Sequence, residues 1–508
     1  ERDYYPEGYV ISYAEAGAAV AQYVSALSAA GYGHGHRIAI LVGNQPEHLL
    51  FKLALNTLGI SCVPVNPDYR PAEIAYLIED SGVELAVVTK NRQALLEAGI
   101  AESGRTVPVV SLDAFSQLPT ASTIPPESGP VHPETEAGLM YTSGTTGKPK
   151  GCRMGHEYEM VLGEWYASRG GLIHFEEGKE RLFNPLPLFH VNAGIVSFFA
   201  MMLTGNCQIQ PERFSRTTWW RDIRETEATC IHYLGVVIPV LMNEPPSPLD
   251  REHKVKFGAG AGVEPVLHQA FEERFGFPLV ELWGMTEMCR ILTDCHKPRQ
   301  IHTRAIGRPQ PGLEVRVVDE HDNDVPLGQQ GEMLVRHSAE TPRKGAFLGY
   351  LNKPEATAEA WQGGWFHTGD TVCQDETGMI YFVDRKKNII RRSGENIAAA
   401  EIEGCIQEHE AVAQVTVLAI ADEMRDEEVY ACVVLRDGQT ADQATAQSIF
   451  EHSYTRMAYY KTPGWLLFVD TLPVTGTQKV LKHKIFGDDE DPRQREGVYD
   501  FRTQKRRS

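Results

Sequence analysis

Segments of helical and of strand character alternate at the start of the chain, and this alternation constrains the fold most. Short apolar runs separate stretches of helical composition; the runs cover 37–42, 62–65 and 85–89, and the helical stretches cover 13–30, 47–58 and 71–81. Strands separated by helices are typical of βαβ units, in which a helix returns the chain to the next parallel strand. We therefore expect an α/β fold built on mostly parallel sheets.

The pattern changes further along the chain. A second α/β region covers about 180–300, short strands with turns fill 305–385, and helices and strands alternate again after Lys387. The charged tail from Gly487 is expected to be loosely ordered. The sequence thus predicts a large N-terminal domain (1–386) of parallel α/β subdomains plus a β-rich subdomain, followed by a small mobile α+β C-terminal domain (387–508).

Composition excludes several classes of protein. The 508 residues carry a formal net charge of −19, which argues against duplex nucleic acid or an anionic membrane as the main partner. The longest nearly apolar stretches, 191–203 and 230–242, are too short to span a bilayer. The 9 cysteines are scattered and odd in number, which favours reduced thiols and a cytoplasmic location over a disulfide framework.

The strongest local motif is the string Tyr-Thr-Ser-Gly-Thr-Thr-Gly-Lys-Pro-Lys-Gly at 141–151. Its glycines and hydroxyl side chains allow backbone N–H and O–H groups to approach an anion closely, and Lys148 and Lys150 add positive charge. A Walker A loop would require Ser or Thr after the lysine, and here Pro149 follows Lys148. The string therefore predicts a phosphate-binding loop of another type.

This string resembles the signature loop of the adenylate-forming superfamily, which includes acyl-CoA and aryl-CoA synthetases, luciferases and peptide-synthetase adenylation domains. Further motifs that resemble those of the family follow in order at 185–190, 258–262, 281–287, 364–370, 384–387, 392–396 and 473–480. The stretches 214–220, 232–235 and 475–478 look most like the crotonobetaine/carnitine-type CoA ligases. The resemblance covers nearly the whole chain.

The resemblance implies a site for ATP or AMP. Trp283, where Tyr is usual, would stack on adenine beside the small residues of 258–262, and Asp370 would accept hydrogen bonds from the ribose hydroxyls. The residues implied for ATP or AMP are Thr142, Ser143, Gly144, Thr145, Thr146, Gly147, Lys148, Gly260, Ala261, Gly262, Glu281, Leu282, Trp283, Gly284, Met285, Thr286, Asp370, Arg385 and Lys479. Glu287 would hold Mg²⁺, which prefers oxygen ligands.

The resemblance also implies a catalytic set and an acyl pocket. Thr286, Glu287 and His190 would act with Lys479 in adenylation, although Gln478 stands where Gly is usual before that lysine. Lys387 would be the hinge between domains, and the loop of Ser393, Gly394 and Glu395 would line the coenzyme A tunnel, with Ser393 where many relatives have a second glycine. The acyl pocket would comprise His190, Val191, Asn192, Leu234, Gly235, Gly284 and Met285.

The implied activity is that of an ATP-dependent acyl-CoA ligase, which forms an acyl-adenylate with release of pyrophosphate and then a CoA thioester. The stretch 189–194 lacks the acidic residue that holds the ammonium group in amino-acid adenylation domains, which argues against an amino acid. The likeness to crotonobetaine/carnitine-type ligases implies a small or medium carboxylic acid, with an aryl or short aliphatic acid as alternatives. The faces of Trp165 and Tyr166 would suit a quaternary ammonium, but core packing is the better interpretation.

Other functions remain open at this stage. The chain could load an acyl group onto a phosphopantetheine carrier protein, or bind nucleotide as a regulatory protein without turnover. The expected partners are a carboxylic acid and CoA, without nucleic acid or a membrane span. The sequence leaves open whether the chain forms a homodimer.

Overall fold

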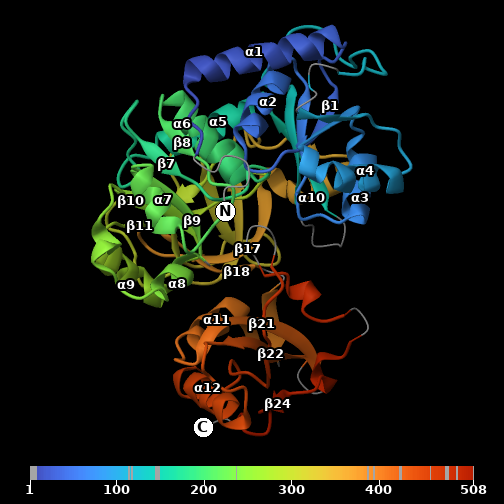
Figure 1. Ribbon diagram of the computed structural model, residues 1–508. Helices are drawn as coiled ribbons and strands as arrows, with labels where there is room; N and C mark the ends of the chain where they lie inside the picture. Colours follow the sequence, from blue (N-terminus) through green and yellow to red (C-terminus); the bar gives the residue numbers. More distant parts are fainter. Residues whose placement is uncertain are drawn as a thin grey trace.

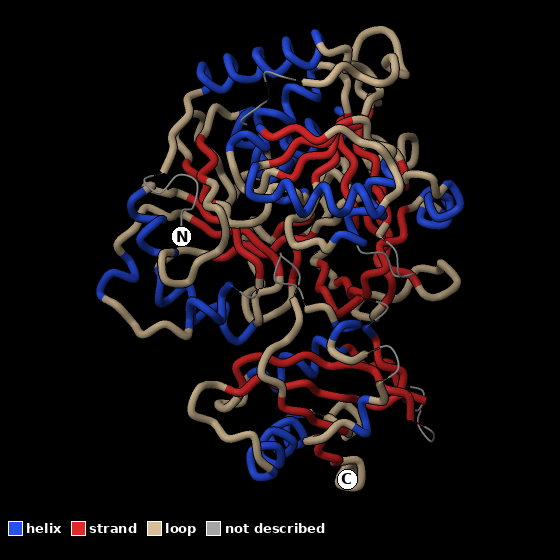
Figure 2. Tube along the Cα trace, turned by 45° about the vertical axis from the view of Figure 1, so that its right-hand side comes forward, coloured by secondary structure: helices blue, strands red, loops and turns tan. Residues whose placement is uncertain are grey.

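The structure is a computed structural model that describes residues 8–112, 115, 118–142, 149–235, 237–385, 388–392, 395–422, 426–457, 459–474, 480–487 and 490–506. The chain forms a larger body up to residue 385 and a smaller body from residue 388 onward, which lies below the larger one in Figures 1 and 2. Within the described residues, no helix is both long and apolar enough to cross a bilayer.

The first sheet contains the strands predicted at the start of the chain. Its strand order is β16 (Gly349–Tyr350), β6 (Lys150–Gly155), β5 (Glu136–Thr142), β2 (Ser61–Pro64), β1 (Arg37–Leu41), β3 (Leu85–Val88) and β4 (Val109–Ser111). The strands from β5 to β4 pair in parallel, whereas β6 and β16 are antiparallel to their neighbours. The expectation of a mostly parallel sheet is confirmed.

Helices cover both faces of this sheet. The helices are α1 (Tyr13–Ala29), α2 (Pro46–Thr57), α3 (Pro71–Ser81) and α4 (Gln93–Glu102). Ile38 and Ile40 of β1 pack toward α1 and α2, and the alternate residues Ala39 and Leu41 pack toward α3 and α4. Because both faces are buried, the strand is a continuous apolar run.

Local sequence sets the helix ends. The hydroxyl of Ser12 accepts from the N–H of Glu15, whose carboxylate accepts from the N–H of Ser12, which makes a capping box at the start of α1. Pro46 and Pro71 occupy the first turns of α2 and α3, where no amide hydrogen is required. Gly82 ends α3 in the left-handed conformation.

The second sheet is the α/β region expected at about 180–300. Its order is β12 (Leu292–Thr293), β11 (Leu279–Trp283), β10 (Phe257–Ala261), β9 (Cys230–Leu234), β7 (Arg181–Phe183) and β8 (Cys207–Ile209). Helices α5 (His156–Ala167) and α6 (Phe198–Leu203) cover one face, and α7 (Trp219–Glu225), α8 (Val237–Met242) and α9 (Pro265–Phe275) cover the other.

The β-rich region forms a third, antiparallel sheet. Its order is β13 (Ala305–Gly307), β18 (Ile380–Arg385), β17 (Phe366–Gln374), β15 (Gly331–Arg336) and β14 (Glu314–Val318). The short helix α10 (Pro354–Ala360) precedes β17. The apolar cluster on one face of the second sheet continues into this sheet, so the larger body shares an extended core.

The smaller body has its own sheet and core. The strands are β19 (Ile389–Arg392), β20 (Glu395–Ala398), β21 (Val412–Asp422), β22 (Asp426–Leu435), β23 (Trp465–Phe468) and β24 (Val498–Asp500), with helices α11 (Ala399–Gln407) and α12 (Gln443–Arg456). The expectation of a loosely ordered tail is wrong, because β24 pairs with β23 and Phe501 enters the core.

Polar contacts join the two bodies near α11. The carboxylate of Asp384 in β18 accepts from the N–H of Ala400 at 2.9 Å, in the first turn of α11. Arg304 donates to the carboxylate of Glu264 at 2.9 Å and to the carbonyl of Ala400 at 3.1 Å. A carboxylate is favourable at a helix N-terminus, so Asp384 stabilises the start of α11 from the larger body.

Candidate active site

The predicted phosphate loop lies almost entirely outside the described residues. Nothing is described for Ser143, Gly144, Thr145, Thr146, Gly147 and Lys148, so their roles stay predictions. The flanking strands are described: Thr142 ends β5, Lys150 begins β6, and the two are cross-strand partners. The loop therefore connects two neighbouring antiparallel strands of the first sheet.

Two glycine-containing turns approach each other closely at the end of the second sheet. A Cβ at Gly260 would lie 2.4 Å from the carbonyl oxygen of Tyr233, and one at Gly235 would lie 2.0 Å from the carbonyl oxygen of Gly262. Gly262 also has a φ of +87°, which favours glycine. Gly260 and Gly235 are thus required by the close packing of the two turns, and Gly262 by its backbone conformation.

Glu281 braces this turn from within the protein. One carboxylate oxygen accepts from the N–H of Gly262 at 2.8 Å, and the other accepts from the hydroxyl of Tyr233 at 2.9 Å and from the N–H of Val263 at 3.2 Å. Burial raises the pKa of Glu281 to about 7, although these hydrogen bonds oppose the shift. Glu281 was predicted to contact the nucleotide; its observed contacts hold the shape of the turn.

A hydrogen bond joins the predicted adenine and ribose residues. Nε1 of Trp283, at the end of β11, donates to Oδ2 of Asp370 in β17 at 2.7 Å, and both side chains are buried. Asp370 is the cross-strand partner of Arg385, whose side chain is outside the described atoms. Trp283 and Asp370, which are far apart in the sequence, therefore meet between the second and third sheets.

Thr286 and Glu287 follow β11 and are fixed by two tyrosines. The hydroxyl of Tyr158 donates to the carbonyl of Thr286 at 2.8 Å, and that of Tyr350 donates to Oε1 of Glu287 at 2.8 Å. Nζ of Lys150 lies 4.8 Å from the centre of the Tyr350 ring. The predicted metal ligand is thereby linked to the strand that follows the phosphate loop.

His190 is held as a neutral imidazole. Burial lowers the pKa of His190 to about 4, and its ring lies 4.5 Å from that of Phe189, centre to centre. The next residues, Asn192–Ser197, form a π-helix, a rare conformation that is frequent at functional sites. His190 therefore offers a neutral ring to its surroundings.

A buried polar network supports the π-helix. Nδ1 of His232 lies 2.7 Å from Oδ1 of Asn192, and its Nε2 lies 2.7 Å from the hydroxyl of Tyr166. Asn184 donates to Asn192 and to Ser197 at 3.0 and 2.9 Å. Burial lowers the pKa of His232 to about 3, so this network is uncharged at neutral pH.

The remaining predicted acyl-pocket residues lie against two apolar clusters. Val191 and Met285 pack against one large cluster, and Leu234 packs against the cluster that contains Leu188 and Ala193. A Cβ at Gly284 would lie 2.8 Å from the side chain of Ile291. The predicted pocket residues thus lie at the end of β9, at the start of the π-helix and in the segment after β11, and their common pocket stays a prediction.

Core packing is the correct interpretation of Trp165 and Tyr166. The guanidinium of Arg169 lies 3.6 Å from the centre of the Trp165 ring, whose Nε1 donates to the carbonyl of Ile291 at 2.8 Å. Tyr166 is fully buried and bonded to His232. A ring already stacked on Arg169 is a poor site for a second cation.

The predicted residues of the smaller body are mostly outside the described part. Lys387, Ser393, Gly394 and Lys479 are not described, nor is the side chain of Glu395. The residues that bracket Lys479 are placed, since Val474 and Val480 form an antiparallel bridge. The hinge, tunnel and catalytic-lysine assignments stay predictions.

Three charged side chains form a buried network in the smaller body. Nε of Arg392 donates to both oxygens of Glu428 at 2.9 and 3.0 Å, and Nζ of Lys505 donates to Glu428 at 2.6 Å. These side chains are at most 4% exposed. Arg392 directly precedes the predicted tunnel loop. Glu428 therefore holds Lys505 close to the strand that leads into that loop.

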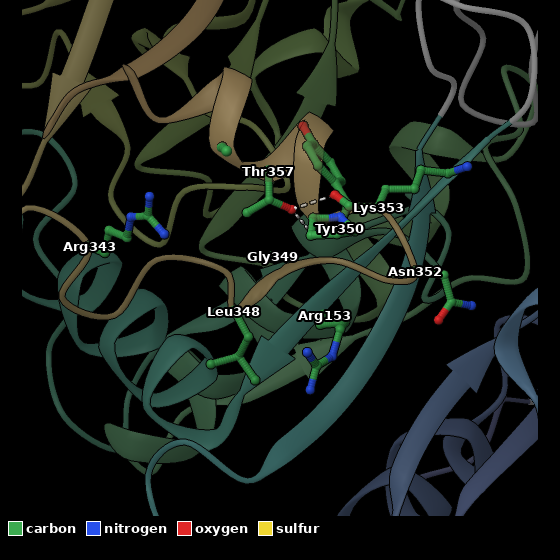
Figure 3. Close-up of a pocket in the computed structure, with 10 residues that line it drawn as sticks. Arg153, Arg343, Leu348, Gly349, Tyr350, Asn352, Lys353 and Thr357 are labelled. Atoms are coloured by element: carbon green, nitrogen blue, oxygen red, sulfur yellow. Dashed lines mark hydrogen bonds between the residues drawn. The ribbon is translucent and has the colours of Figure 1, made fainter. Parts of the chain in front are cut away.

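A separate cavity of about 360 Å³ lies beside Tyr350 (Figure 3). It is lined by Arg153, Arg343, Leu348, Gly349, Tyr350, Asn352, Lys353, Pro354, Thr357 and Ala358. None of these residues was assigned to a site from the sequence. The cavity shares only Tyr350 with the contacts of the predicted nucleotide site described above.

Sequence reasoning missed the residues that support the site. Predicted site residues accept hydrogen bonds from Tyr350 and Tyr158, and another belongs to the network around His232. None of these supporting residues carries a recognisable functional motif of its own. A lone tyrosine or histidine in an apolar stretch gives no signal of the partner it will meet. Only the structure identifies these contacts.

Two family models match the chain. The model described as AMP-binding enzyme matches residues 2–351, and the model described as AMP-binding enzyme C-terminal domain matches residues 401–479. Among curated proteins, the crotonobetaine/carnitine–CoA ligase of Citrobacter koseri is 30% identical over 493 residues, which cover 93% of this chain and 92% of that protein. The sulfoacetate–CoA ligase of Cupriavidus necator is 29% identical over 464 residues, with 90% and 88% covered.

Solved structures match over nearly the whole chain. ATP-bound MatB from Rhodopseudomonas palustris superposes with a TM-score of 0.80 at 25% identity, covering 94% of this chain and 93% of that one. O-succinylbenzoate coenzyme A synthetase (MenE) from Bacillus subtilis, in complex with AMP, gives a TM-score of 0.80 at 25% identity, covering 95% and 94%.

Proposed function

The chain belongs to the AMP-binding enzyme family, as an AMP-forming acid–thiol ligase, and on that premise we propose that it activates a small or medium carboxylic acid. The acid reacts with ATP to give an acyl-adenylate and pyrophosphate. The acyl group then passes to the thiol of CoA, and AMP leaves. Two residues of the larger body, Trp283 and Asp370, bind the nucleoside.

The hydrogen bond between Trp283 and Asp370 is the observation that carries this assignment. It joins the end of β11 to β17 at 2.7 Å and fixes a carboxylate beside an aromatic ring on the strand that pairs with β10 and its turn at 260–262. An aromatic face can stack on adenine, and a carboxylate accepts hydrogen bonds from ribose hydroxyls. These complementary groups support one nucleoside site between the second and third sheets.

The chemical difficulty of the first step is charge. A carboxylate must approach the α-phosphate of ATP, and both are anions. The backbone donors of 142–148 and the ammonium group of Lys479 would provide positive potential where charge develops on the phosphate. The protein accelerates such a transfer mainly by positioning the reactants and stabilising the developing charge, with little covalent participation of its own.

Glu287 fits a role as a magnesium ligand. Its carboxylate is mostly buried and positioned by the Tyr350 hydroxyl at 2.8 Å, and Mg²⁺ is commonly held by one or two carboxylates together with phosphate oxygens and water. When bound, Mg²⁺ would neutralise phosphate charge. Tyr350 would keep the Glu287 carboxylate oriented toward the phosphates.

The second step requires different groups at the acyl carbon. We propose that the smaller body rotates about Lys387, so that the loop of Ser393, Gly394 and Glu395 replaces Lys479 and lines the path of the CoA thiol. The separate core of the smaller body supports this proposal, because a body with its own core can move as a unit.

We propose that the acid lies among His190, Val191, Asn192, Leu234, Gly235, Gly284 and Met285. The neutral His190 ring and the apolar packing of Leu234 and Met285 favour an acid whose remaining part is uncharged or weakly polar. The relatives named above act on different acids, so the acid itself must be measured. We also propose a cytoplasmic enzyme, since all nine cysteines are free.

A pyrophosphate-release screen tests the proposed function. Purified protein receives MgATP and single carboxylic acids, with and without CoA. We expect acid-dependent pyrophosphate release, formation of an acyl-CoA when CoA is present, and strong loss of both in Asp370→Asn but not in the exposed control Asp68→Asn. Absence of release with every acid would refute the function, and transfer only to a phosphopantetheine carrier would replace CoA as acceptor.

Separate assays of the half-reactions test the division of roles. Lys479→Ala is expected to slow adenylation by about 10²–10³-fold, the size seen when one charge-stabilising donor is lost. Conversion of a supplied acyl-adenylate to acyl-CoA should change far less, and the exposed control Lys484→Ala should affect neither step. Equal loss in both half-reactions would contradict the rotation.

A further inference from the structure

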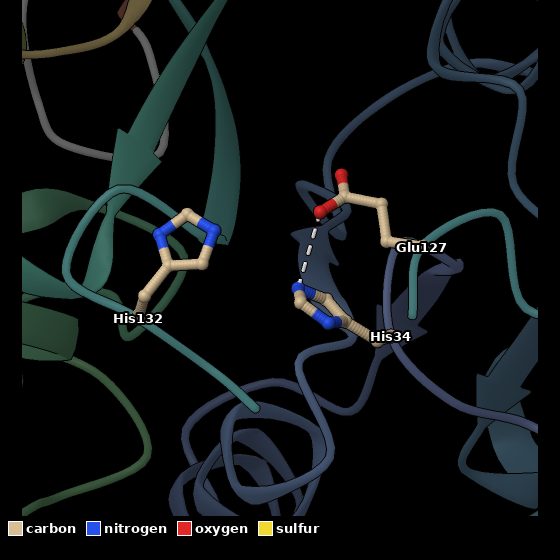
Figure 4. Close-up of side chains that lie close together, drawn as sticks. All are labelled: His34, Glu127 and His132. Carbon is tan, nitrogen blue, oxygen red and sulfur yellow. Dashed lines mark ion pairs between the residues drawn. The ribbon is translucent and has the colours of Figure 1, made fainter. Parts of the chain in front are cut away.

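Two histidines and a glutamate converge in the larger body, apart from every residue assigned to ATP or the acid. His34 lies between α1 and β1, and Glu127 and His132 lie in the proline-containing segment that leads to β5 (Figure 4). One ligand atom from each of the three side chains lies within 4.8 Å of the others. We propose that His34, Glu127 and His132 form a binding site for one Zn²⁺ ion.

The hydrogen bonds of His34 prepare one nitrogen for a cation. Nδ1 lies 3.4 Å from the carbonyl oxygen of Gly129, which accepts a hydrogen bond in the tautomer that carries its proton on Nδ1 and leaves the lone pair of Nε2 for a cation. Such a carbonyl partner for the second nitrogen is common among metal-bound histidines. Nε2 lies near Glu127 and near the hydroxyl of Thr135.

The spacing of His34 and Glu127 suits two ligands of one metal ion. Nε2 of His34 lies 3.2 Å from Oε2 of Glu127, and in this tautomer a lone pair and a carboxylate oxygen face each other. Either a proton or a metal ion between them makes the contact favourable. In a tetrahedral zinc site with bonds of about 2.0–2.1 Å, ligand atoms lie roughly 3.3 Å apart, which matches this spacing.

His132 distinguishes a metal ion from a proton. A proton needs only His34 and Glu127, whereas His132 adds a third donor that completes the two-histidine, one-carboxylate set typical of zinc. The backbone N–H of His132 donates to the hydroxyl of Thr135 at 3.1 Å, and that oxygen also lies 3.1 Å from Nε2 of His34. The Thr135 hydroxyl therefore lies beside both histidines, and it would turn away from Nε2 of His34 when that nitrogen binds the ion.

The ligands also span a structural junction. The backbone N–H of Glu127 donates to the carbonyl of His34 at 3.1 Å, so the segment is seated before any metal binds. Little ordering is needed on binding, because only the exposed side chains of Glu127 and His132 must adjust. A bound ion would fasten the segment 118–133 to the connection between α1 and β1.

Isothermal titration of tag-free, chelator-treated protein with ZnCl₂ tests the proposal. We expect one ion per chain with a dissociation constant of about 10 µM or tighter, and weakening of about tenfold or more in His132→Ala and in Glu127→Gln. Both side chains are exposed, so these variants should fold. Visible absorption of the Co²⁺-loaded protein should show a four-coordinate spectrum that His132→Ala loses.

The control is His321→Ala, which removes another exposed histidine. Nδ1 of His321 lies 4.0 Å from Oε1 of Glu320, but this pair belongs to no three-residue cluster found among the described residues. This variant should bind Zn²⁺ as the parent does. Binding that is absent at 100 µM ZnCl₂, or that is equal in His132→Ala and the parent, would overturn the site and leave a direct hydrogen bond between His34 and Glu127 as the explanation of their contact.

Discussion

Replacement of Trp283 by Phe isolates the hydrogen bond that joins the predicted adenine and ribose groups. Phenylalanine keeps an aromatic face but removes the indole N–H that donates to Oδ2 of Asp370 at 2.7 Å. Both side chains are less than a tenth exposed, so water cannot readily replace the lost donor. The Asp370 carboxylate should then lose its fixed orientation toward the ribose.

The expected magnitude follows from the type of bond. A hydrogen bond to a charged group is worth about 1.5–3 kcal/mol, but this bond exists before ATP binds, so only the cost of reorienting Asp370 enters the affinity. We assign roughly 1.4 kcal/mol to that cost, which corresponds to a tenfold rise in the KM for ATP. The kcat should change much less, because no reacting atom is touched.

Steady-state kinetics with ATP and 3′-deoxy-ATP separate orientation from stacking. The parent enzyme should prefer ATP because Asp370 reads the ribose hydroxyls, and Trp283→Phe should reduce this preference. The control is Trp219→Phe, since Nε1 of the buried Trp219 has no hydrogen-bond partner among the described residues. An equal rise in KM for both nucleotides, or no change, would refute the orienting role of Trp283.

Further predictions concern buried charged and titratable groups. Burial raises the pKa of Glu281 from 4.5 to about 7, so its contribution to stability is fully present below pH 4.5 and is lost as the pH rises through 7. The melting temperature should therefore fall between pH 4.5 and 7, and Glu281→Gln should flatten this fall. An unchanged slope in the variant would contradict the raised pKa. Burial lowers the pKa of His190 to about 4, so the KM for the acid should not change with pH near 6.5. A change in this KM near pH 6.5 that His190→Phe abolishes would be inconsistent with a neutral ring. Glu428→Gln leaves Arg392 and Lys505 buried without their carboxylate and should lower the free energy of unfolding of the smaller body by about 3–5 kcal/mol in urea titrations. The exposed control Glu496→Gln should leave that free energy unchanged, and equal stability of the two variants would argue against the network.

Much of the fold could be predicted, because the spacing of apolar residues and the residues at helix ends determine secondary structure through near neighbours in the sequence. The apolar run at 37–42 is buried on both faces of β1, as a parallel strand requires, and Pro46 and Pro71 begin the helices on either side of the next strand. The change to short strands at 305–385 marks the antiparallel third sheet. These features depend on neighbours in the sequence.

Contacts between distant segments could not be predicted in the same way. Nothing in the sequence around Trp283 indicates that its N–H meets Asp370, because the two residues come from different sheets. The charged tail looked loosely ordered, yet Lys505 is buried because it meets Glu428 in β22. The sequence motifs named groups for a site, and the structure supplied the buried partners that orient them.

Transfer of labelled oxygen from the acid to AMP tests the central claim most directly. An acid that supports turnover is prepared with oxygen-18 in its carboxylate and incubated with ATP and CoA, and the AMP and pyrophosphate are examined by mass spectrometry. If the carboxylate attacks the α-phosphorus, each AMP carries one label atom and the pyrophosphate carries none. Unlabelled AMP, or label in pyrophosphate or in orthophosphate, would contradict activation through an acyl-adenylate.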